Sequence, residues 1–156
     1  MATYKHNGGT GGQPALARTP YLLEEVIDFA VVAGDVTIGS TDTFRVLNIP
    51  AYTWVSSAGW EVLTAESGAA TSKMELGDGG DTDRWVAAAV FDTINVASTP
   101  AATTSALGWY VGSTADTIDL LSSVAAATNG KLRVWAVCVD TRPEGNATDS
   151  KTWSTA

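Results

Sequence analysis

The side chains that most often carry catalysis are scarce in this chain of 156 residues. There is one histidine, His6, in a glycine-rich leading segment, and one cysteine, Cys138, between Val137 and Val139. Nucleophilic catalysis by serine or cysteine needs a base held by an ordered scaffold, which a histidine in such a segment does not supply. A thiol flanked by valines is typical of an inert, buried cysteine. The sequence therefore indicates a protein that is not an enzyme.

Three aspartates, Asp78, Asp81 and Asp83, lie on a glycine-rich segment and are the best candidates for metal ligands. Carboxylate oxygens on such a loop suit Ca²⁺. The spacing departs from the EF-hand pattern, in which acidic residues alternate and a bidentate glutamate closes the loop. The alternative is an ordinary turn whose aspartates accept hydrogen bonds from their own backbone. We expect no cofactor, with Ca²⁺ at this loop as the one ion to test.

Six tryptophans supply the other candidate chemistry, because an indole face can stack on the apolar face of a sugar. Trp54, Trp60 and Trp135 lie in apolar runs, and we expect them in the core. Trp85 and Trp109 are the candidates for a carbohydrate platform. The alternative for both is packing in the core or at a subunit interface.

The formal charge of −8 argues against binding nucleic acid, which requires clustered Lys and Arg. Lys5 and Arg18 precede the first carboxylate, Glu24, so the leading segment is slightly cationic and suits docking onto another acidic surface. No stretch approaches the roughly 18 apolar residues that indicate a membrane span, and no apolar core of a signal peptide is visible. We therefore expect synthesis in a cytoplasm and no membrane partner.

The pattern along the chain divides it into three parts. Residues 1–20 are rich in glycine and poor in large apolar groups, which predicts a flexible, extended N-terminal arm that includes Lys5, His6, Arg18 and Pro20. Residues 21–142 contain the alternating and apolar runs of a β-rich body. Residues 143–156 form a polar C-terminal tail.

Eight segments of the body have the pattern of strands, separated by turn residues. The first, Leu22 to Ala33, has a short helix from Tyr21 to Phe29 as its alternative, and Arg84 to Phe91 fits a strand or a short helix. The others are Thr43 to Ile49, Thr53 to Thr64, Thr71 to Leu76, Leu107 to Val111, Thr117 to Leu121 and Lys131 to Thr141. Residues 78–83 are expected to form a tight acidic loop, and residues 95–106 an exposed excursion. Because no amphipathic helix separates the strands, the pattern favours an all-β sandwich or barrel, with a jelly-roll-like sandwich of about eight strands preferred.

Several turn and strand signatures between residues 45 and 141 resemble those of small β-rich virion proteins of tailed bacteriophages, especially phages of marine and cyanobacterial hosts. The segments that carry the resemblance are Val46-Leu47-Asn48-Ile49-Pro50-Ala51, residues 59–66, Leu76 to Asp83, residues 115–120 and Leu132 to Asp140. None of these segments is an active-site motif.

The resemblance implies a decoration, or cement, protein on the outer surface of the capsid. Such a protein is a jelly-roll-like module, often a homotrimer, that bridges neighbouring major capsid subunits, and the family has no catalytic residues to carry over. The arm would then be the capsid-binding segment, ordering on contact. The alternative function is a tail or vertex appendage that binds host surface carbohydrate.

Overall fold

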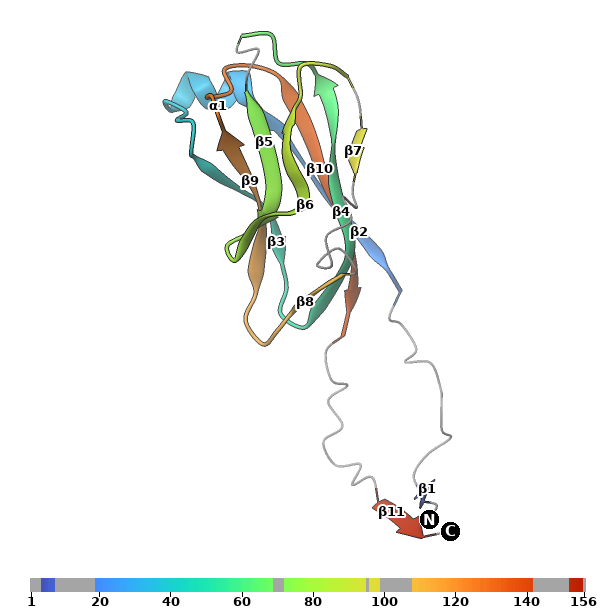
Figure 1. The fold of residues 1–156 in the computed structure, drawn as a ribbon. Helices are drawn as coiled ribbons and strands as arrows, with labels where there is room; N and C mark the ends of the chain where they lie inside the picture. The colour runs from blue at the N-terminus through green and yellow to red at the C-terminus, as the bar shows by residue number, and fades with distance from the viewer. Residues whose placement is uncertain are drawn as a thin grey trace.

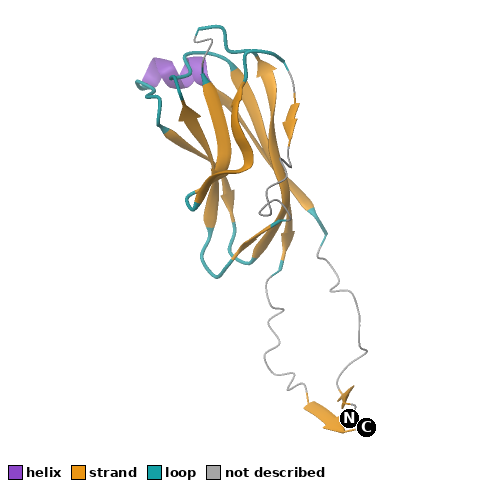
Figure 2. Cartoon of the chain, in the orientation of Figure 1, coloured by secondary structure: helices purple, strands orange, loops and turns teal. Residues whose placement is uncertain are grey.

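The structure, a computed structural model, describes residues 4–7, 19–68, 72–94, 96–98, 108–141 and 152–155; of residues 4–7, 96–98 and 152–155 it describes the backbone. These ranges are mostly β-structure, with one short helix at one end (Figure 2). The strands are β1 (Tyr4–Asn7), β2 (Tyr21–Asp28), β3 (Thr43–Ile49), β4 (Thr53–Thr64), β5 (Lys73–Asp78), β6 (Asp81–Val90), β7 (Val96–Ser98), β8 (Trp109–Val111), β9 (Asp116–Ser123), β10 (Lys131–Asp140) and β11 (Thr152–Thr155). The helix is α1 (Phe29–Asp35).

Strands β2 to β10 form two antiparallel sheets that pack face to face (Figure 1). One sheet has the order β2-β10-β4, and β7 and β8 both pair with the far edge of β4; the other has the order β3-β9-β5-β6. Since β7 pairs with residues 59–61 of β4 and β8 with residues 53–55, the two share one strand position, which gives four positions in each sheet.

The pairing of these strands is nested along the chain. Strand β5 pairs with β6, β4 with β7 and β8, β3 with β9, and β2 with β10. The ladders β4–β10 and β5–β9 then join these pairs into the two sheets. A long hairpin folded in this way is the jelly roll. The predicted all-β sandwich of about eight strands is confirmed, and its order is that of a jelly roll.

The core lies between the two sheets and follows the alternation of each strand. In β10 the even-numbered residues Leu132, Val134, Ala136 and Cys138 are fully buried, whereas the residues between them face outward. At the end that carries α1, Phe29 closes the core, with its ring 5.6 Å from that of Phe44 and 5.5 Å from that of Phe91. Burying one large apolar side chain contributes roughly 1.5–3 kcal/mol, so these layers dominate the stability of the body.

A β-bulge in β4 changes which of its residues face the core. Cys138 lies opposite Val55, but Val137 lies opposite Ser57, so Ser56 is an extra residue in the ladder. The Ser56 hydroxyl donates to the carbonyl of Val137 at 3.1 Å. Before the bulge the odd-numbered residues of β4 face inward, and after it the even-numbered ones do. Trp54 therefore faces outward, and Trp60 faces the core.

The first predicted strand ends five residues earlier than expected. Strand β2 stops at Asp28, whose carboxylate accepts a hydrogen bond from the N–H of Ala30 at 3.1 Å and caps helix α1. The N–H of Phe29 donates to the carbonyl of Gly130, which fixes the start of the helix against the turn before β10. The apolar residues after Asp28 are therefore helical, and the alternative helix from Tyr21 to Phe29 is wrong.

The predicted acidic loop is shorter than expected. Strand β5 runs to Asp78 and β6 begins at Asp81, so Gly79 and Gly80 alone form the turn of this hairpin. The segment from Arg84 to Phe91, for which a strand or a helix was predicted, lies in β6 up to Val90 and is extended. Within the described part of the chain, no helix is long and apolar enough to cross a membrane.

Strands β1 and β11 form a separate two-stranded antiparallel ribbon, beyond the end of the sandwich where β2 begins and β10 ends (Figure 1). Asn7 lies opposite Thr152 in this ribbon, and Tyr21 lies opposite Cys138 in the body. Residues 8–20 connect β1 to β2 and residues 141–151 connect β10 to β11, which are thirteen and eleven residues. Connections of similar length therefore lead from neighbouring strands of the body to the paired strands of the ribbon.

Candidate functional site

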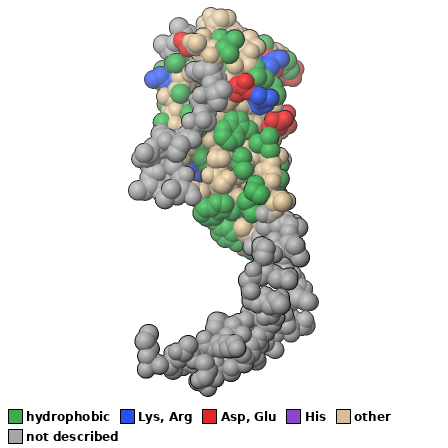
Figure 3. All heavy atoms as spheres, turned by 90° about the vertical axis from the view of Figure 1, so that its right-hand side faces the viewer, with side chains coloured by type: hydrophobic (Ala, Val, Ile, Leu, Met, Phe, Trp, Pro, Cys, Tyr) green, Lys and Arg blue, Asp and Glu red, His purple; other side chains and the backbone are tan. Residues whose placement is uncertain are grey.

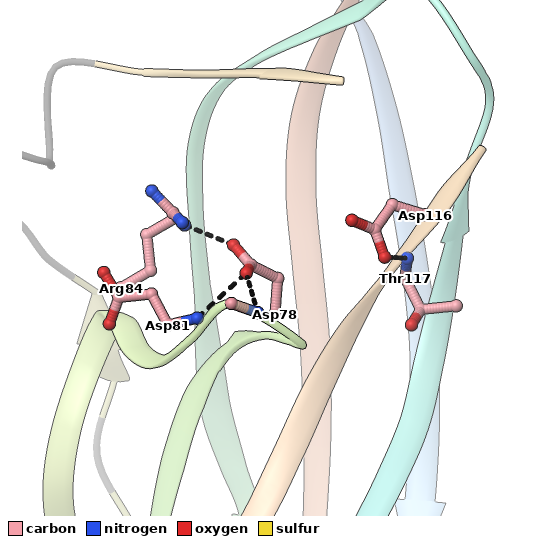
Figure 4. A network of polar contacts seen from close by, with 6 residues as sticks. Asp78, Asp81, Arg84, Asp116 and Thr117 are labelled. Atoms are coloured by element: carbon pink, nitrogen blue, oxygen red, sulfur yellow. Dashed lines mark hydrogen bonds and ion pairs between the residues drawn. The ribbon is translucent and has the colours of Figure 1, made fainter. Parts of the chain in front are cut away.

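The carboxylate of Asp78 is committed to the hairpin between β5 and β6. Asp78 is 4% exposed, and its Oδ1 accepts hydrogen bonds from the N–H groups of Gly80 at 2.7 Å and Asp81 at 3.0 Å (Figure 4). Its Oδ2 forms an ion pair with the guanidinium of Arg84. This is the turn chemistry that was the alternative to a metal site. Asp78 thus holds the hairpin closed and fixes the start of β6.

Asp81 and Asp83 lie close together but do not combine with Asp78 into a ligand set. A hydrogen bond with Asp81 raises the pKa of Asp83, and partial burial and the charges of Asp81 and Glu75 act in the same direction. Among the residues that the structure describes, no group of three or more His, Cys, Asp or Glu side chains could hold a metal ion. Binding of Ca²⁺ at this hairpin stays an untested prediction.

Trp85 and Trp109 close one edge of the sandwich, where β6 faces β8. Their rings lie 5.4 Å apart at an angle of 73°, and the guanidinium carbon of Arg84 is 6.0 Å from the Trp85 ring and 5.6 Å from the Trp109 ring. Trp85 is only 3% exposed, so it presents no indole face to a sugar or a subunit. Trp85 therefore packs in the core, which was the alternative prediction for this residue. Trp109 is partly exposed, and its role as a binding residue stays a prediction.

A different set of aromatic side chains lies on the outer face of the β2-β10-β4 sheet. Val139, Trp54 and Tyr110 lie opposite one another on three adjacent strands. The next outward row contains Leu22, Val137 and Ser57, and the row after it contains Glu24, Trp135 and Gly59. We call the six large apolar members the apolar outer face: Leu22, Trp54, Tyr110, Trp135, Val137 and Val139.

This apolar outer face is open to solvent. Leu22 is 57% exposed, Tyr110 50% and Trp54 37%. Figure 3 shows hydrophobic side chains gathered over the half of this side that lies toward the chain termini, and charged side chains nearer the other end. The expectation that Trp54 and Trp135 fill the core was wrong, because the bulge at Ser56 turns Trp54 outward and the alternation of β10 turns Trp135 outward.

The charged side chains in the rows beside this face form ion pairs with one another. Arg133 pairs with Glu61, and the Lys131 ammonium lies 2.9 Å from a carboxylate oxygen of Asp28. The hydrogen bond from Lys131 lowers the pKa of Asp28. Apart from Glu24, the outward rows from Tyr110 to Asp28 therefore contribute little net charge.

A shallow polar hollow lies at the end of the β3-β9-β5-β6 sheet, lined by Arg45, Asn48, Gly79, Ala115, Asp116, Thr117 and Asp119. Asp116 accepts a hydrogen bond from the N–H of Thr117 at 2.8 Å (Figure 4). Asp119 lies opposite Arg45 in the β3–β9 ladder, so charges of both signs face the hollow. No aromatic ring lines it, which makes it a poor platform for a sugar.

The predicted arm residues are only partly described. The backbones of Lys5 and His6 lie in β1, opposite Ser154 and Trp153. Pro20 is exposed just before β2, and Arg18 lies outside the described residues. The predicted excursion at 95–106 also lies mostly outside them. The predicted boundaries of the arm at 1–20 and of the tail at 143–156 stay predictions, although the ribbon shows that the two segments pair.

The lone cysteine behaves as its sequence context predicts. Cys138 is fully buried in the core, and burial raises the pKa of its thiol to about 11. A thiol with that pKa is almost entirely protonated at neutral pH, so it is a poor nucleophile.

The fold of this chain is similar to that of a chain in a solved phage capsid structure. It is similar to a chain of the capsid asymmetric unit of cyanophage Pam1, with a TM-score of 0.61 and 20% identity, over 83% of this chain and 91% of the other. It also matches a chain of the acidic stable capsid structure of Helicobacter pylori bacteriophage KHP30, with a TM-score of 0.49 and 10% identity, over 89% and 93% of the two chains. No protein-family model and no curated protein sequence matches it. At 20% identity the likeness to the Pam1 chain establishes a shared fold.

Proposed function

We propose that this chain is a virion structural protein that decorates the outer capsid surface of a tailed phage and bridges neighbouring major capsid subunits. The observation that carries this proposal is the shared fold with a chain of the Pam1 capsid asymmetric unit, which extends over nearly all of that chain. Cys138 is buried and its thiol has a raised pKa, so this side chain is a poor nucleophile.

The distribution of charge supports contact through the terminal segments. Residues 1–20 and 142–156 carry four basic residues, Lys5, Arg18, Arg142 and Lys151, and two acidic ones, Glu144 and Asp149, a net charge of +2. The whole chain has a net charge of −8, so residues 21–141 carry −10. A cationic appendage on an acidic body favours docking onto an acidic partner, whereas the body itself repels nucleic acid.

In the proposed mechanism the body forms a homotrimer, and the arm from Ala2 to Pro20 lies across adjacent capsid subunits. Each arm makes weak contacts, but several arms on one trimer act together as avidity. The pairing of β1 with β11 adds that the C-terminal segment takes part in the same contact, since it forms the other strand of the ribbon.

Truncation tests the arm directly. Every residue of the described core lies between Phe29 and Cys138, so deletion of residues 2–20 should leave a folded body that no longer binds expanded heads. Deletion of residues 143–156 removes β11 and should weaken binding by less. Far-ultraviolet circular dichroism checks the fold of both truncations, and co-sedimentation with heads measures binding. Full binding by the protein without residues 2–20 would overturn the role of the arm.

The apolar outer face favours one alternative, an appendage at a tail or vertex that binds host carbohydrate, because Trp54 and Tyr110 are exposed side by side. Binding on a glycan array that is lost in Trp54→Ala would support this alternative. If the carbohydrate site is instead at Trp109, as the sequence predicts, the same loss is expected in Trp109→Ala. A full chain that binds no glycan would overturn both carbohydrate sites.

A further inference from the structure

We propose that copies of this chain contact one another through the apolar outer face of the β2-β10-β4 sheet. The inference assigns the contact on which the homotrimer of the proposed function rests.

The apolar outer face leaves large apolar side chains in contact with water. Leu22, Trp54 and Tyr110 are between 37% and 57% exposed, and they lie in adjacent rows with Val137 and Val139. Scattered apolar residues on a surface need no explanation, but a contiguous patch on one sheet indicates an interaction site. Aromatic side chains are enriched in the buried centres of protein interfaces.

The charge distribution favours a second copy of the chain as the partner that covers this face. Residues 21–141 carry a net charge of −10, so two bodies repel each other over most of their surfaces. The rows of Tyr110, Trp54 and Val139 and of Ser57, Val137 and Leu22 contain no charge at all. A second copy can approach these two rows with little electrostatic repulsion. Because these two rows carry no charge, they offer no electrostatic attraction to a cationic partner.

The edge of the same sheet is less suited to association than its face. Strand β2 is an edge strand, and edge strands can pair with another chain to extend a sheet. The middle of β2 carries Glu24 and Glu25, both exposed, and carboxylates on an edge oppose such pairing. Association through the face, rather than through the β2 edge, is therefore favoured.

The position of the chain ends also favours association through this face. The apolar outer face lies toward the end of the sandwich where β2 begins at Tyr21 and β10 ends at Asp140. Copies joined through this face would have their terminal segments leaving from a common rim. That arrangement presents several arms to the capsid at once, which is what avidity requires.

The test compares two double variants of the full chain by sedimentation velocity. Leu22→Glu with Tyr110→Glu places two carboxylates on the apolar outer face. Val31→Glu with Val36→Glu adds the same two charges at α1, where Val31 is 62% exposed and Val36 57%, as exposed as Leu22. We expect the wild type and the α1 variant to sediment as one oligomer, at a multiple of 16.2 kDa, and the face variant to sediment as a 16.2 kDa monomer.

Three results would overturn the inference: a wild type that stays monomeric at about 100 times the lowest concentration measured, a face variant that keeps the wild-type mass, or an α1 variant that dissociates equally. Thermal melting checks that the face variant is folded, and Leu22→Ser with Tyr110→Ser replaces it if it is not. Head binding is measured separately. A monomeric wild type that still binds heads would overturn this inference and leave the proposed function standing, and an oligomer that never binds heads would do the reverse.

Discussion

The two sheets of the sandwich share one core but have very different outer faces. Outside the β2-β10-β4 sheet, apolar side chains are exposed and the charges form opposite pairs such as Lys131 with Asp28. In the β3-β9-β5-β6 sheet, a hydrogen bond with Asp81 raises the pKa of Asp83, and both residues lie on β6. The two sheets thus differ in how their charges are arranged: opposite charges pair beside the apolar outer face, whereas two carboxylates adjoin each other on β6.

The largest effect that separates the inner and outer sides should appear within one strand, β4. Trp60 is fully buried, so Trp60→Ala leaves a cavity and should lower the free energy of unfolding by about 3–5 kcal/mol. Trp54 faces outward and is 37% exposed, so Trp54→Ala should cost about 1 kcal/mol or less. Urea denaturation of dilute protein measures both changes. Equal costs would mean that the bulge at Ser56 is not formed and that both indoles are buried.

A smaller effect is expected at the hairpin between β5 and β6. Asp78→Asn removes a buried carboxylate that pairs with Arg84 and accepts from the turn, and it should lower the free energy of unfolding by about 1.5–3 kcal/mol. Asp116→Asn is the matched control, because Asp116 is exposed and accepts one hydrogen bond from its neighbour Thr117. Its cost should stay within about 0.5 kcal/mol. If Asp78→Asn costs no more than the control, the ion pair does not hold the hairpin.

Much of the fold could be predicted because local pattern and tertiary structure agree. The predicted bounds of β3, Thr43 to Ile49, and of β4, Thr53 to Thr64, are those of the structure. Alternation, a proline stop and turn residues were sufficient there. The helix after Asp28 was missed because its apolar residues continue the run of β2 without a break. What ends the strand is the capping carboxylate and the contact of Phe29 with the Gly130 turn, and that contact is tertiary.

The candidate surface was harder to predict, and the bulge in β4 is the reason. Period-two counting places Trp54 on the same side as Trp60, and one extra residue, Ser56, reverses that relation. The sequence contains a signal in the polar pair Ser56-Ser57, which interrupts the apolar run, and the buried positions of β4 change from odd to even numbers at this pair. Trp135 was misplaced for a different reason. An apolar run such as Leu132 to Val139 reads as buried on both faces, and only the sheet order shows that one face has no layer above it.

The smallest expected effect is a difference of sign between a carboxylate on each of the two sheets as the pH falls. The pKa of Asp28 is lowered by Lys131, so its stabilising contribution is present above the unfolded value of about 3.8 and is lost as the pH falls through the lower, folded pKa. The pKa of Asp83 is raised, chiefly by Asp81. Its charge therefore opposes folding above the raised pKa, and protonation relieves that effect as the pH falls through it.

Carboxyl ¹³C shifts in NMR titrations should show Asp28 titrating below 3.8 and Asp83 above it. Lys131→Met should return the pKa of Asp28 toward 3.8 and leave Asp83 unchanged, whereas Asp81→Asn should lower the pKa of Asp83 and leave Asp28 unchanged. Because Lys131 lies beside the apolar outer face and Asp81 on the opposite sheet, each variant is the control for the other. A common shift of both carboxyls in either variant would show that they respond to the net charge of the whole body, and the contrast between the two faces would then not be local.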